Sequence, residues 1–564
     1  MTSRHRSTRR ARLGTAAVLA TAASTALLGV VAGPAQAAPQ AGWAPTATHG
    51  LSLLGATAQG AAPATTPLRL TVGLAPRDRA GLDALIRSQA TPGSADYGRY
   101  LTPDQFTSRF AATSGTAAAV VSYLQSAGMQ NVTVSSNRLQ VTADATVAQA
   151  SSAFHTTIAQ FQQGGRTVLA NVSDAQVPAS LSGAVSGVSG LSTLGFALKP
   201  QAVGLPKLTG YYPKEFNTVY HSAGTKAGDR QTLAVIAEGD LTQTVKDLRT
   251  AEAAQKLPQA PVTLRYTGIK SPDTAGADEW DLDTQTSTGV APNSSLIVYI
   301  ATSLTDSDLA RAVNAFAAEN KAKAGSASLG ECDLLPYLDG TMAIDDMAFA
   351  EAAVQGQTFF ASSGDTGSAC PVAPTNGVPG SGLPDTSYPA SSPYVTAVGG
   401  TTLVTDDSDA YQQELGWNAG GGGASPVEYP GYWQNGVVPT AAVPVQPMRG
   451  VPDVAFDADP NTGAQIYVDG TPTQIGGTSL SSPLAMGLWT RINSSHNGAL
   501  GFAPPKLYGL YTKAQNGSLL PPSSVPGFHD VTLGTNVPYP ATPGWDYDTG
   551  LGSYDVAALS KALH

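Results

Sequence analysis

The sequence contains few of the residues that define several common classes of protein. Its 564 residues include only two cysteines, too few for a disulfide-rich scaffold or a cysteine-rich zinc site. Charged residues make up 13% of the chain, and acidic residues outnumber basic ones by 41 to 31. Because a nucleic-acid-binding protein usually carries a basic surface, this balance argues against nucleic acid as a partner.

Long apolar runs are absent beyond the first 37 residues. Residues 4–12 contain five arginines and no acid, an Ala/Thr-rich apolar run covers residues 16–32, and Ala-Gln-Ala follows at residues 35–37. This order is typical of a secretory signal peptide cleaved before Ala38, although a membrane anchor is the alternative. We therefore expect a secreted protein with a signal peptide over residues 1–37 and no stable membrane association. The export route, general or twin-arginine, stays open.

The rest of the chain is rich enough in apolar residues to fold and divides into two parts by charge. Hydrophobic residues make up 42% of the sequence, which excludes wholesale disorder, and the length suggests two or three domains. Residues 38–204 carry nine basic and six acidic residues, a net charge of +3. Residues 205–564 carry 17 basic and 35 acidic residues, a net charge of −18. We expect a domain boundary near residue 204.

The first part alternates helix and strand patterns. Apolar residues recur at helical spacing in residues 82–86 and again in residues 120–124. Residues 131–134 and 138–142 are typical of two strands joined by a turn. These patterns predict a small α+β domain, and the ferredoxin-like arrangement is the one we expect.

The second part has the pattern of an α/β domain. Near-continuous apolar runs occur at residues 232–237, 295–301 and 358–361, and helical patterns occur at residues 306–321 and 341–355. Strands that are covered on both faces have such runs, and parallel sheets are their usual source. In these folds ligands bind beyond the carboxyl ends of the strands, so we expect the functional residues in the loops at that edge.

One stretch places a hydroxyl group at the expected start of a helix. Gly476-Gly-Thr-Ser479-Leu-Ser-Ser-Pro483 precedes an apolar run, and its glycines allow a sharp turn. The free N–H groups and the dipole at a helix N-terminus favour a developing anion. Ser479 is therefore a candidate nucleophile, although an ordinary helix-capping serine has the same local pattern.

A nucleophilic serine needs a base, and carboxylates are the better candidates here. The histidines of the second part lack the glycine-rich setting that usually presents a catalytic histidine; they are His221, His496, His529 and His564. On a helix Glu279 and Asp283 lie on one face, whereas Asp281 points elsewhere. Two adjacent carboxylates resist double ionisation, so one pKa rises and that group can accept and return a proton. A solvated acidic helix face is the alternative.

Two further stretches offer candidate functional residues. A buried strand delivers Asp365 into a glycine-flanked turn, where a protonated carboxyl could donate a hydrogen bond to an oxyanion; a turn aspartate that bonds its own backbone is the alternative. Asp530 and Asp546 lie in a turn-rich segment near the end of the chain. Carboxylates and carbonyls suit calcium, although the spacing is not that of an EF-hand.

Together these motifs resemble the sedolisin family of serine-carboxyl peptidases, which includes kumamolisin. The resemblance rests on Glu279-x-x-x-Asp283, Ser-Gly-Asp365, Gly-Thr-Ser479-x-x-x-Pro483 and Pro-Gly-Trp-Asp546-x-x-Thr-Gly-Leu-Gly. Residues 92–106 are similar to the family's propeptide. The motifs occur in the family's order over nearly the whole chain after the predicted signal peptide.

The resemblance implies a subtilisin-like catalytic domain with a mostly parallel sheet over residues 205–564. It also implies a propeptide and linker over residues 38–204, which would act as an intramolecular inhibitor and chaperone. The expected product is a self-processing zymogen of a secreted endopeptidase that hydrolyses proteins and peptides, and we expect a monomer. An inactive binding protein with the same fold, a non-peptidase acyl hydrolase and a tripeptidyl-peptidase-type exopeptidase are the alternatives.

The resemblance also implies a role for each candidate residue. Ser479 would be the nucleophile, Glu279 its general base, Asp283 a support for Glu279, and Asp365 the oxyanion-stabilising group. One structural calcium ion would bind the carboxylates and carbonyls of Asp530, Val531, Thr542, Gly544 and Asp546. The family usually has glycine where Thr542 stands, which leaves the loop geometry open.

The carboxyl chemistry predicts an acidic pH optimum. A carboxylate is a weak base at neutral pH, and Asp365 can donate a hydrogen bond only while it is protonated. We expect hydrolysis through an acyl-serine intermediate in mildly acidic solution. The charge split suggests that acid also weakens the contact between propeptide and catalytic domain, with cleavage around residues 200–205.

Three smaller features complete the expectations. Cys332 and Cys370 both follow apolar runs, and an exported chain favours a disulfide between them over two free thiols. Glu238 is a possible extension of the proton network, but its register is ambiguous and it is left out of the site. The glycine run at residues 420–423 is either a substrate-facing loop or a plain connector.

Overall fold

The computed structural model describes most of the chain after the predicted signal peptide. The described residues are 42–51, 56–163, 165–194, 201–202, 208–370, 383–440, 446–518, 521–522 and 524–563, and they belong to one compact unit. The predicted signal peptide lies outside them. Among the described residues we find no helix with the length and apolar character needed to cross a membrane.

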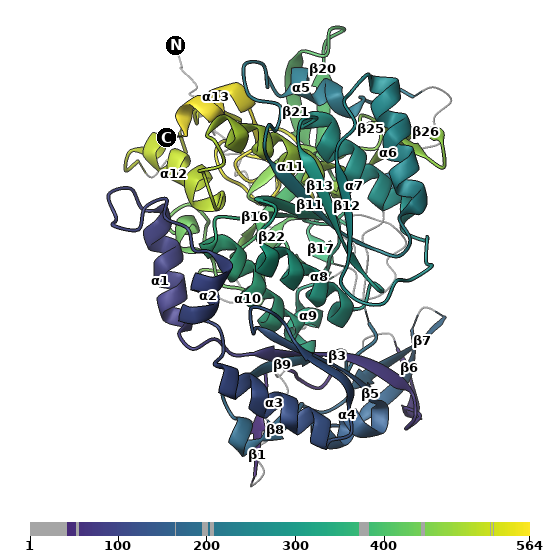
Figure 1. The fold of residues 1–564 in the computed structure, drawn as a ribbon. Coiled ribbons are helices and arrows are strands. Elements are labelled where there is room, and N and C mark those ends of the chain that lie inside the picture. Colours follow the sequence, from purple (N-terminus) through teal and green to yellow (C-terminus); the bar gives the residue numbers. More distant parts are fainter. Residues whose placement is uncertain are drawn as a thin grey trace, which may run out of the picture. The chain divides into compact units, whose positions relative to one another are not determined.

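Residues 42–194, here called the N-terminal domain, have an α+β fold (Figure 1). The main sheet is antiparallel with strand order β4-β5-β3-β9, and a smaller sheet has the order β2-β6-β7. The helices are α1 (Arg79–Ala90), α2 (Pro103–Arg109), α3 (Ser114–Ser126) and α4 (Val147–Ala153). The strands are β1 (Trp43–Pro45), β2 (Thr57–Ala61), β3 (Pro67–Leu74), β4 (Gln130–Val134), β5 (Gln140–Thr146), β6 (Ile158–Gln163), β7 (Arg166–Asn171), β8 (Gln176–Pro178) and β9 (Val185–Ser189).

Residues 208–563, here called the C-terminal domain, are built on an eight-stranded sheet. Its order is β12-β13-β11-β14-β16-β20-β21, with β24 also paired to β20. All of these pairings are parallel except that of β20 with β21. The strands are β11 (Thr232–Glu238), β12 (Val262–Tyr266), β13 (Ser295–Ala301), β14 (Ala324–Ala327), β16 (Thr358–Ser362), β20 (Thr396–Thr405), β21 (Tyr411–Gly416) and β24 (Val454–Asp457).

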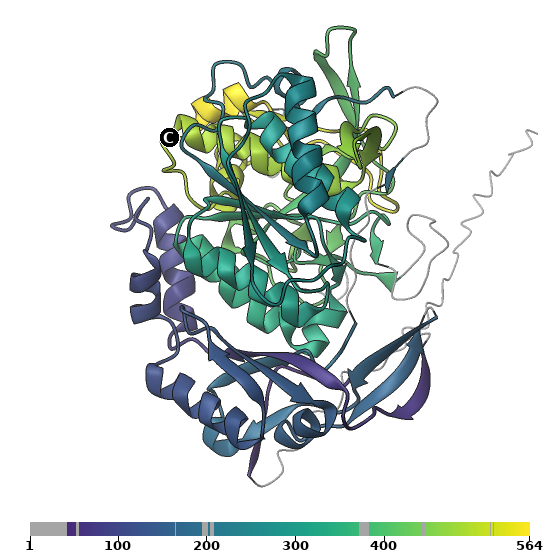
Figure 2. The same cartoon turned by 45° about the vertical axis from the view of Figure 1, so that its right-hand side comes forward.

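Helices cover both faces of this sheet (Figures 1 and 2). One group packs together against β11, β14, β16 and β20 and comprises α6 (Thr242–Gln255), α7 (Ala277–Val290) and α11 (Thr478–Ser495). The second group contacts the other face and the N-terminal domain and comprises α8 (Asp306–Glu319) and α10 (Thr341–Val354). The apolar runs of the sequence form the central strands because both of their faces are buried. The predicted α/β fold with a mostly parallel sheet is therefore confirmed.

Short elements connect and complete the C-terminal domain. The helices are α5 (Phe216–Val219), α9 (Leu334–Asp339), α12 (Pro504–Gln515) and α13 (Val556–Ala562). The strands are β10 (Gln201–Ala202), β15 (Glu331–Cys332), β17 (Ala369–Cys370), β18 (Leu383–Pro384), β19 (Ser387–Tyr388), β22 (Gly423–Ala424), β23 (Gly450–Val451), β25 (Ala464–Val468), β26 (Thr471–Gly476), β27 (Phe528–His529) and β28 (Ser553–Tyr554). The predicted strands and helices of both domains lie within a few residues of the observed ones.

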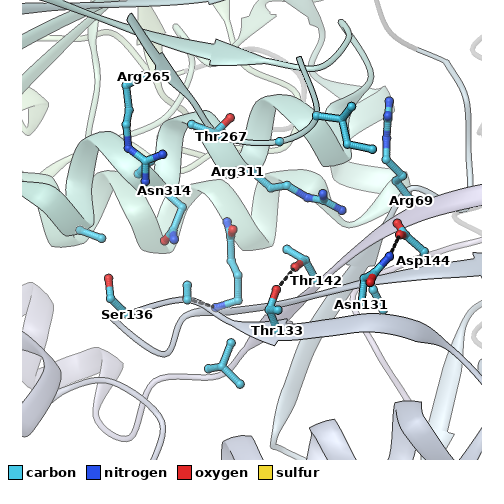
Figure 3. A pocket seen from close by; sticks show the side chains of 18 of the residues that line it. Arg69, Asn131, Thr133, Ser136, Thr142, Asp144, Arg265, Thr267, Arg311 and Asn314 are labelled. Atoms are coloured by element: carbon cyan, nitrogen blue, oxygen red, sulfur yellow. Dashed lines mark hydrogen bonds between the residues drawn. The ribbon is translucent and has the colours of Figure 1, made fainter. Parts of the chain in front are cut away.

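The two domains share an apolar and a polar contact. Leu82 and Phe106, from α1 and α2, belong to the same buried cluster as the core of the C-terminal domain. Arg69 of β3 forms an ion pair with Asp308 of α8. Packing is incomplete beside this pair, where Arg69, Arg265 and Arg311 line a cavity of about 560 Å³ (Figure 3). Water can reach these charges, so we expect salt to weaken this part of the contact.

The linker between the domains pairs with a strand that leads to the candidate nucleophile. β10 is antiparallel to β26, with Gln201 opposite Gly476 and Ala202 opposite Ile475. Ser479 follows Gly476 by three residues along the chain. The backbone of the linker therefore joins the sheet formed by β25 and β26, close in sequence to the start of α11.

Candidate active site

Ser479 lies in the first turn of α11 and is fully buried. The preceding Gly477 has a φ of 100°, which disfavours any residue with a side chain. A Cβ at Gly477 would also lie 2.5 Å from Oδ2 of Asp365. The glycine is thus required both for the turn that starts the helix and for the close approach of the Asp365 carboxyl group.

Glu279 and Ser479 face each other across the packed helices α7 and α11. Glu279 is 3% exposed. Burial, and next the charge of Asp283, raise the pKa of Glu279 well above its ordinary value, and a hydrogen bond with Ser479 partly offsets this rise. Among the described residues, the Ser479 hydroxyl and both Glu279 carboxyl oxygens make no hydrogen bond of ordinary geometry. The hydroxyl and the carboxyl group are therefore close together and have no competing partner, as proton transfer between them requires.

Asp283 lies one turn further along α7 and is completely buried. Its Oδ1 accepts a hydrogen bond of 2.6 Å from the Ser328 hydroxyl. Burial raises the pKa of Asp283 to about 8, although the hydrogen bond with Ser328 lowers it. Since the neighbouring Glu279 also has a raised pKa, the pair holds at least one proton in neutral and acidic solution.

Ser328 is a polar residue of the site that the sequence reasoning missed. Its Oγ lies 2.6 Å from Asp283 Oδ1 and 3.2 Å from the carbonyl oxygen of Ser479. Pro483 lies inside α11 and has no N–H to bond the carbonyl four residues earlier, which is that of Ser479. The proline was a signal that this carbonyl needed another partner, but nothing near Ser328 in the sequence identified it as the donor.

Asp365 follows β16 and reaches the start of α11. Its Oδ1 accepts hydrogen bonds from the backbone N–H of Thr478 at 2.8 Å and from the Thr478 hydroxyl at 2.7 Å. The same hydroxyl accepts a bond of 3.1 Å from the N–H of Gly364. Because Oδ1 accepts these bonds, a proton on Asp365 is expected on Oδ2, the oxygen nearer Gly477.

The glycine run at residues 420–423 supports the turn that carries Asp365. The N–H of Gly421 donates to the carbonyl of Gly364 at 2.7 Å, and Ser363 Oγ donates to the carbonyl of Gly421 at 2.7 Å. A Cβ at Gly421 would lie 1.9 Å from the Ser363 carbonyl oxygen. This glycine therefore allows two backbone segments to approach each other. The sequence had suggested a substrate-facing loop or a plain connector, and neither interpretation includes this contact.

The other acids considered from the sequence lie elsewhere. Burial, and next the charge of Asp247 on α6, raise the pKa of Asp281 to about 8, so Asp281 faces α6 as the helix geometry predicted. Glu238 lies at the end of β11, where burial and the charges of Asp273 and Asp308 raise its pKa to about 7. Neither residue contacts Glu279 or Ser479 in any interaction found among the described residues.

The histidines do not join the candidate site in the described part of the chain. His221 and His529 both lie near Asp555, and Nε2 of His496 lies 2.8 Å from the carbonyl oxygen of Ser560. His564 lies outside the described residues. The carboxyl group of Glu279 thus lies beside the candidate nucleophile Ser479, where a Ser-His-Asp triad has an imidazole.

Hydrogen bonds join four of the five predicted calcium ligands in two pairs. The N–H of Thr542 donates to Asp546 Oδ2 at 2.7 Å, and the N–H of Gly544 donates to both oxygens of Asp530 at 3.1 Å. Burial raises the pKa of Asp546 to about 6 and also raises that of Asp530. Two carboxylates withdrawn from water fit the preference of calcium for oxygen ligands.

The two cysteines lie on short strands. Cys332 is buried on β15, and Cys370 ends β17. The side chain of Cys370 lies outside the described part of the structure. A disulfide between the two therefore stays a prediction.

Comparisons with known proteins agree with this geometry. Residues 54–194 match the family described as "Pro-kumamolisin, activation domain", and residues 272–520 match the family described as "Subtilase family". The chain is 37% identical to sedolisin of Pseudomonas sp. (strain 101) over 92% of each chain. It is 34% identical to xanthomonalisin of Xanthomonas sp. (strain T-22) over 88% of this chain and 65% of the relative.

A solved structure is similar as well. Pseudomonas sedolisin, described as a serine-carboxyl proteinase complexed with two molecules of pseudo-iodotyrostatin, superposes with a TM-score of 0.57 at 37% identity. The superposition covers 63% of this chain and 98% of that chain.

Proposed function

Since the chain belongs to the sedolisin family of serine-carboxyl peptidases, we propose that Ser479, Glu279, Asp283 and Asp365 are its catalytic residues and that it is an acid-active endopeptidase. The chain is a serine-type peptidase with an N-terminal pro-domain. The observation that carries the proposal is the buried contact between the Ser479 hydroxyl and the Glu279 carboxyl group.

In the proposed reaction Glu279 carries two protons in succession, one in each half of the reaction. It accepts the proton of Ser479 Oγ while this oxygen attacks the peptide carbonyl carbon, and it then donates that proton to the leaving amine nitrogen. The C–N bond breaks and leaves an acyl-serine. Glu279 next accepts a proton from the attacking water, and returns it to Ser479 Oγ when the acid product leaves. Glu279 is neutral while it holds the proton, so no cation has to form in a site that excludes water.

Asp283 is proposed to keep Glu279 in the ionised state that the first step needs. If Asp283 holds the proton of the pair, Glu279 remains the carboxylate beside Ser479. Both groups have raised pKa values, so the pair retains at least one proton at neutral and acidic pH, and the proposal assigns this proton to Asp283. Protonation of both groups would stop the reaction at very low pH, and loss of the shared proton would slow it at high pH.

Asp365 is proposed to donate a hydrogen bond from Oδ2 to the oxyanion of the tetrahedral intermediate. The bonds from Thr478 hold its other oxygen in place, and a fixed donor stabilises developing charge without reorganisation. Only the protonated form can donate. This requirement, added to the weak basicity of a carboxylate, is the reason that we propose an acidic optimum.

A pH-resolved cleavage profile on a mixed peptide library tests the proposal. We expect internal cleavage sites in the library peptides and a rate maximum in mildly acidic solution. Maximal activity above pH ~7, where an ordinary carboxylic acid is ionised, would overturn the roles of Glu279 and Asp365. Release of tripeptides from the amino ends alone would replace the endopeptidase assignment with an exopeptidase.

We propose that one structural calcium ion binds the loop that contains Asp530 and Asp546. The carboxylates of these two residues would hold it together with the carbonyls of Val531, Thr542 and Gly544, and the ion would offset the charge of the buried carboxylates. Chelation should lower the thermal stability of the protein, and calcium should restore it but magnesium should not. An unchanged melting temperature after chelation would contradict the proposal.

We also propose export and acid-dependent maturation. Residues 1–37 would be removed on secretion, Cys332 and Cys370 would form a disulfide, and the enzyme would act as a monomer on extracellular proteins. Acid would weaken the contact between the inhibitory pro-domain and the acidic C-terminal domain, and so allow cleavage near residues 200–205. The amino terminus and a non-reducing peptide map of the secreted protein would test the first two points.

A further inference from the structure

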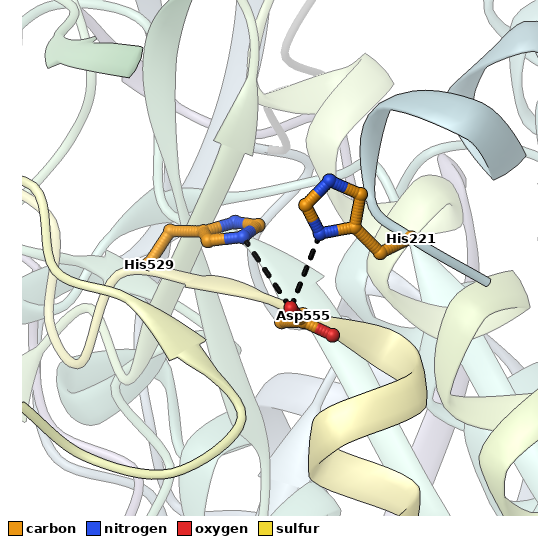
Figure 4. A group of neighbouring side chains, drawn as sticks. All are labelled: His221, His529 and Asp555. Carbon is orange, nitrogen blue, oxygen red and sulfur yellow. Dashed lines mark hydrogen bonds and ion pairs between the residues drawn. The ribbon is translucent and has the colours of Figure 1, made fainter. Parts of the chain in front are cut away.

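Outside the candidate active site, one cluster of metal-binding side chains brings together both ends of the C-terminal domain. His221 follows α5, His529 lies on β27, and Asp555 precedes α13 (Figure 4). Nδ1 of His221 lies 3.1 Å from Asp555 Oδ2, and Nε2 of His529 lies 4.0 Å from the same oxygen. One potential ligand atom from each residue lies within 4.8 Å of the others.

Backbone hydrogen bonds hold the three segments in place. The N–H of Ala557 donates to the carbonyl of His221 at 3.1 Å, and the N–H of Asp555 donates to the carbonyl of Gly527 at 3.0 Å. His529 pairs with Ser553 in the ladder between β27 and β28. The cluster is therefore part of the fold and does not depend on mobile side chains meeting at the surface.

The side chains are also oriented toward a common point. Oδ1 of Asp555 accepts the N–H of Ala558 at 2.9 Å as the cap of α13, and this bond leaves Oδ2 on the side of the two imidazoles. Nδ1 of His529 lies 3.3 Å from Ser553 Oγ, and its ring stacks on Tyr411 with centroids 3.9 Å apart. Such contacts to the second ring nitrogen fix the direction of a metal-binding histidine.

From this geometry we propose that His221, His529 and Asp555 bind one Zn²⁺ ion. Two imidazoles and one carboxylate, with water in the fourth position, are a common ligand set for this ion. Ligand atoms of a tetrahedral zinc site lie about 3.3 Å apart. The 3.1 Å contact already fits, the 4.0 Å contact needs a shift of under 1 Å, and the two imidazole nitrogens lie within 4.8 Å of each other and need a shift of at most about 1.5 Å. His221 is 45% exposed, which gives the ion a path from solvent.

This zinc site would have a structural role that is separate from the calcium loop. Imidazole nitrogen favours zinc over calcium, which takes oxygen ligands. The bound ion would join α5, near the start of the C-terminal domain, to α13 at its end. We therefore expect zinc to stabilise this domain against thermal unfolding without taking part in peptide hydrolysis.

The test is zinc binding to the full precursor with Ser479→Ala, which cannot digest itself. The protein is stripped of metal, returned to excess calcium at neutral pH, and dialysed against Zn²⁺, with Co²⁺ absorption as a second probe of tetrahedral coordination. We expect one Zn²⁺ per chain and a higher melting temperature. His221→Asn and Asp555→Asn should each weaken zinc binding at least about 100-fold and remove the thermal shift.

Both variants are chosen to preserve the fold. Asparagine tolerates the φ of 51° at His221, and it can cap α13 in place of Asp555. His155→Asn is the matched control, because His155 has a φ of 46° but lies in the N-terminal domain; it should bind zinc as the parent does. No zinc binding by the parent, or equal zinc binding by the parent and both cluster variants, would overturn the proposal.

Discussion

The two domains differ sharply in what they bury. In the N-terminal domain every buried polar side chain among residues 42–51, 56–163 and 165–194 is uncharged. The C-terminal domain buries acids from several of its elements and loops, including Glu279, Asp281, Asp283, Glu351, Glu414, Asp457 and Asp548. Its buried basic side chains, among the described residues, are Arg449 and Arg491. The interior of the peptidase domain thus contains carboxyl groups, whereas the described interior of the pro-domain does not.

Burial changes what these acids contribute. It raises the pKa of Asp281, Asp283 and Asp548 to about 8 in each case, so these groups are largely protonated near neutrality. The formal charge of −18 for residues 205–564 therefore overstates the charge present at pH 7. Local pairs such as Arg69 with Asp308 therefore contribute a larger share of the attraction to the pro-domain than the formal net charges suggest.

At one residue of the domain contact, acid should strengthen the association of the two domains, which is the opposite of the proposed acid-induced loosening. Asn137 of the N-terminal domain donates a hydrogen bond to Glu351, and burial raises the pKa of Glu351 to about 8 despite this bond. If exposure on dissociation returned its pKa to the ordinary range, acid would favour the associated state at this position. Acid-induced loosening must therefore come from other groups at the contact, namely those that are ionised in the complex.

The largest expected effect is the loss of kcat when a catalytic residue of the C-terminal domain is replaced. Ser479→Ala or Glu279→Gln should each lower kcat by about 10⁶-fold, because the residues of such a catalytic unit fail together. Glu238→Gln is the matched control, since it also removes a buried glutamate with a raised pKa but leaves the site intact. Steady-state kinetics on a cleaved library peptide measure both. Equal losses in the Glu279 and Glu238 variants would show that any buried acid has this effect.

The second prediction concerns the effect of buried Asp281 on the stability of the protein. The folded state holds the proton of Asp281 up to about pH 8, whereas the unfolded chain loses it near pH 4. The free energy of unfolding therefore falls as pH rises through this window. Asp281→Asn should be more stable than the parent at pH 8 by roughly 3–5 kcal/mol and similar near pH 4.

Denaturation of the Ser479→Ala precursor across this pH range measures the difference between the two proteins. Asp407→Asn is the control, because Asp407 is exposed in a turn and is solvated before and after unfolding. A constant stability difference between the Asp281 variant and its parent from pH 4 to pH 8 would contradict the burial argument.

The third prediction separates acids that react from acids that are merely buried. Asp365→Ala should reduce kcat by about 10²–10³-fold if Asp365 donates to the oxyanion. Labelling of Ser479 by an active-serine reagent should persist, which would show that the site remains folded. An unchanged kcat would remove Asp365 from the mechanism.

The smallest effect concerns the contact between the domains. Arg69→Gln removes the cation that pairs with Asp308, and the arginine is 33% exposed. A partly exposed pair contributes up to about 1 kcal/mol, so precursor processing near neutral pH should accelerate by about two- to fivefold. Arg166→Gln, at an exposed hairpin of the same domain, should not change the rate. If the parent itself processes equally fast at pH 4 and pH 7, the acid-release proposal is wrong.

The sequence predicted those parts of the site that lie on single elements. The spacing of Glu279 and Asp283 placed both on one helix face, and the glycines before Ser479 placed it at a helix start. The same reasoning located the central strands, because a strand buried on both faces must be apolar throughout.

Sequence patterns could not predict contacts between segments that are far apart in the chain. Ser328 follows β14 and is close to Asp283 because α11 packs against both β14 and α7. Nothing in its neighbours in the sequence indicates this. Gly421 was ambiguous for the same reason, since its partner at Gly364 lies 57 residues away. His221 and Asp555 were each uninformative alone, because their chemistry depends on two ends of a domain meeting.

The pairing of β10 with β26 has a kinetic consequence. A segment that is already laid against the strand leading to Ser479 needs no diffusional encounter with a second molecule before it is cut. Conversion of the precursor should therefore be first order, with a half-life that does not change on dilution. Maturation would then proceed at the same pace in a crowded culture and in a single isolated molecule.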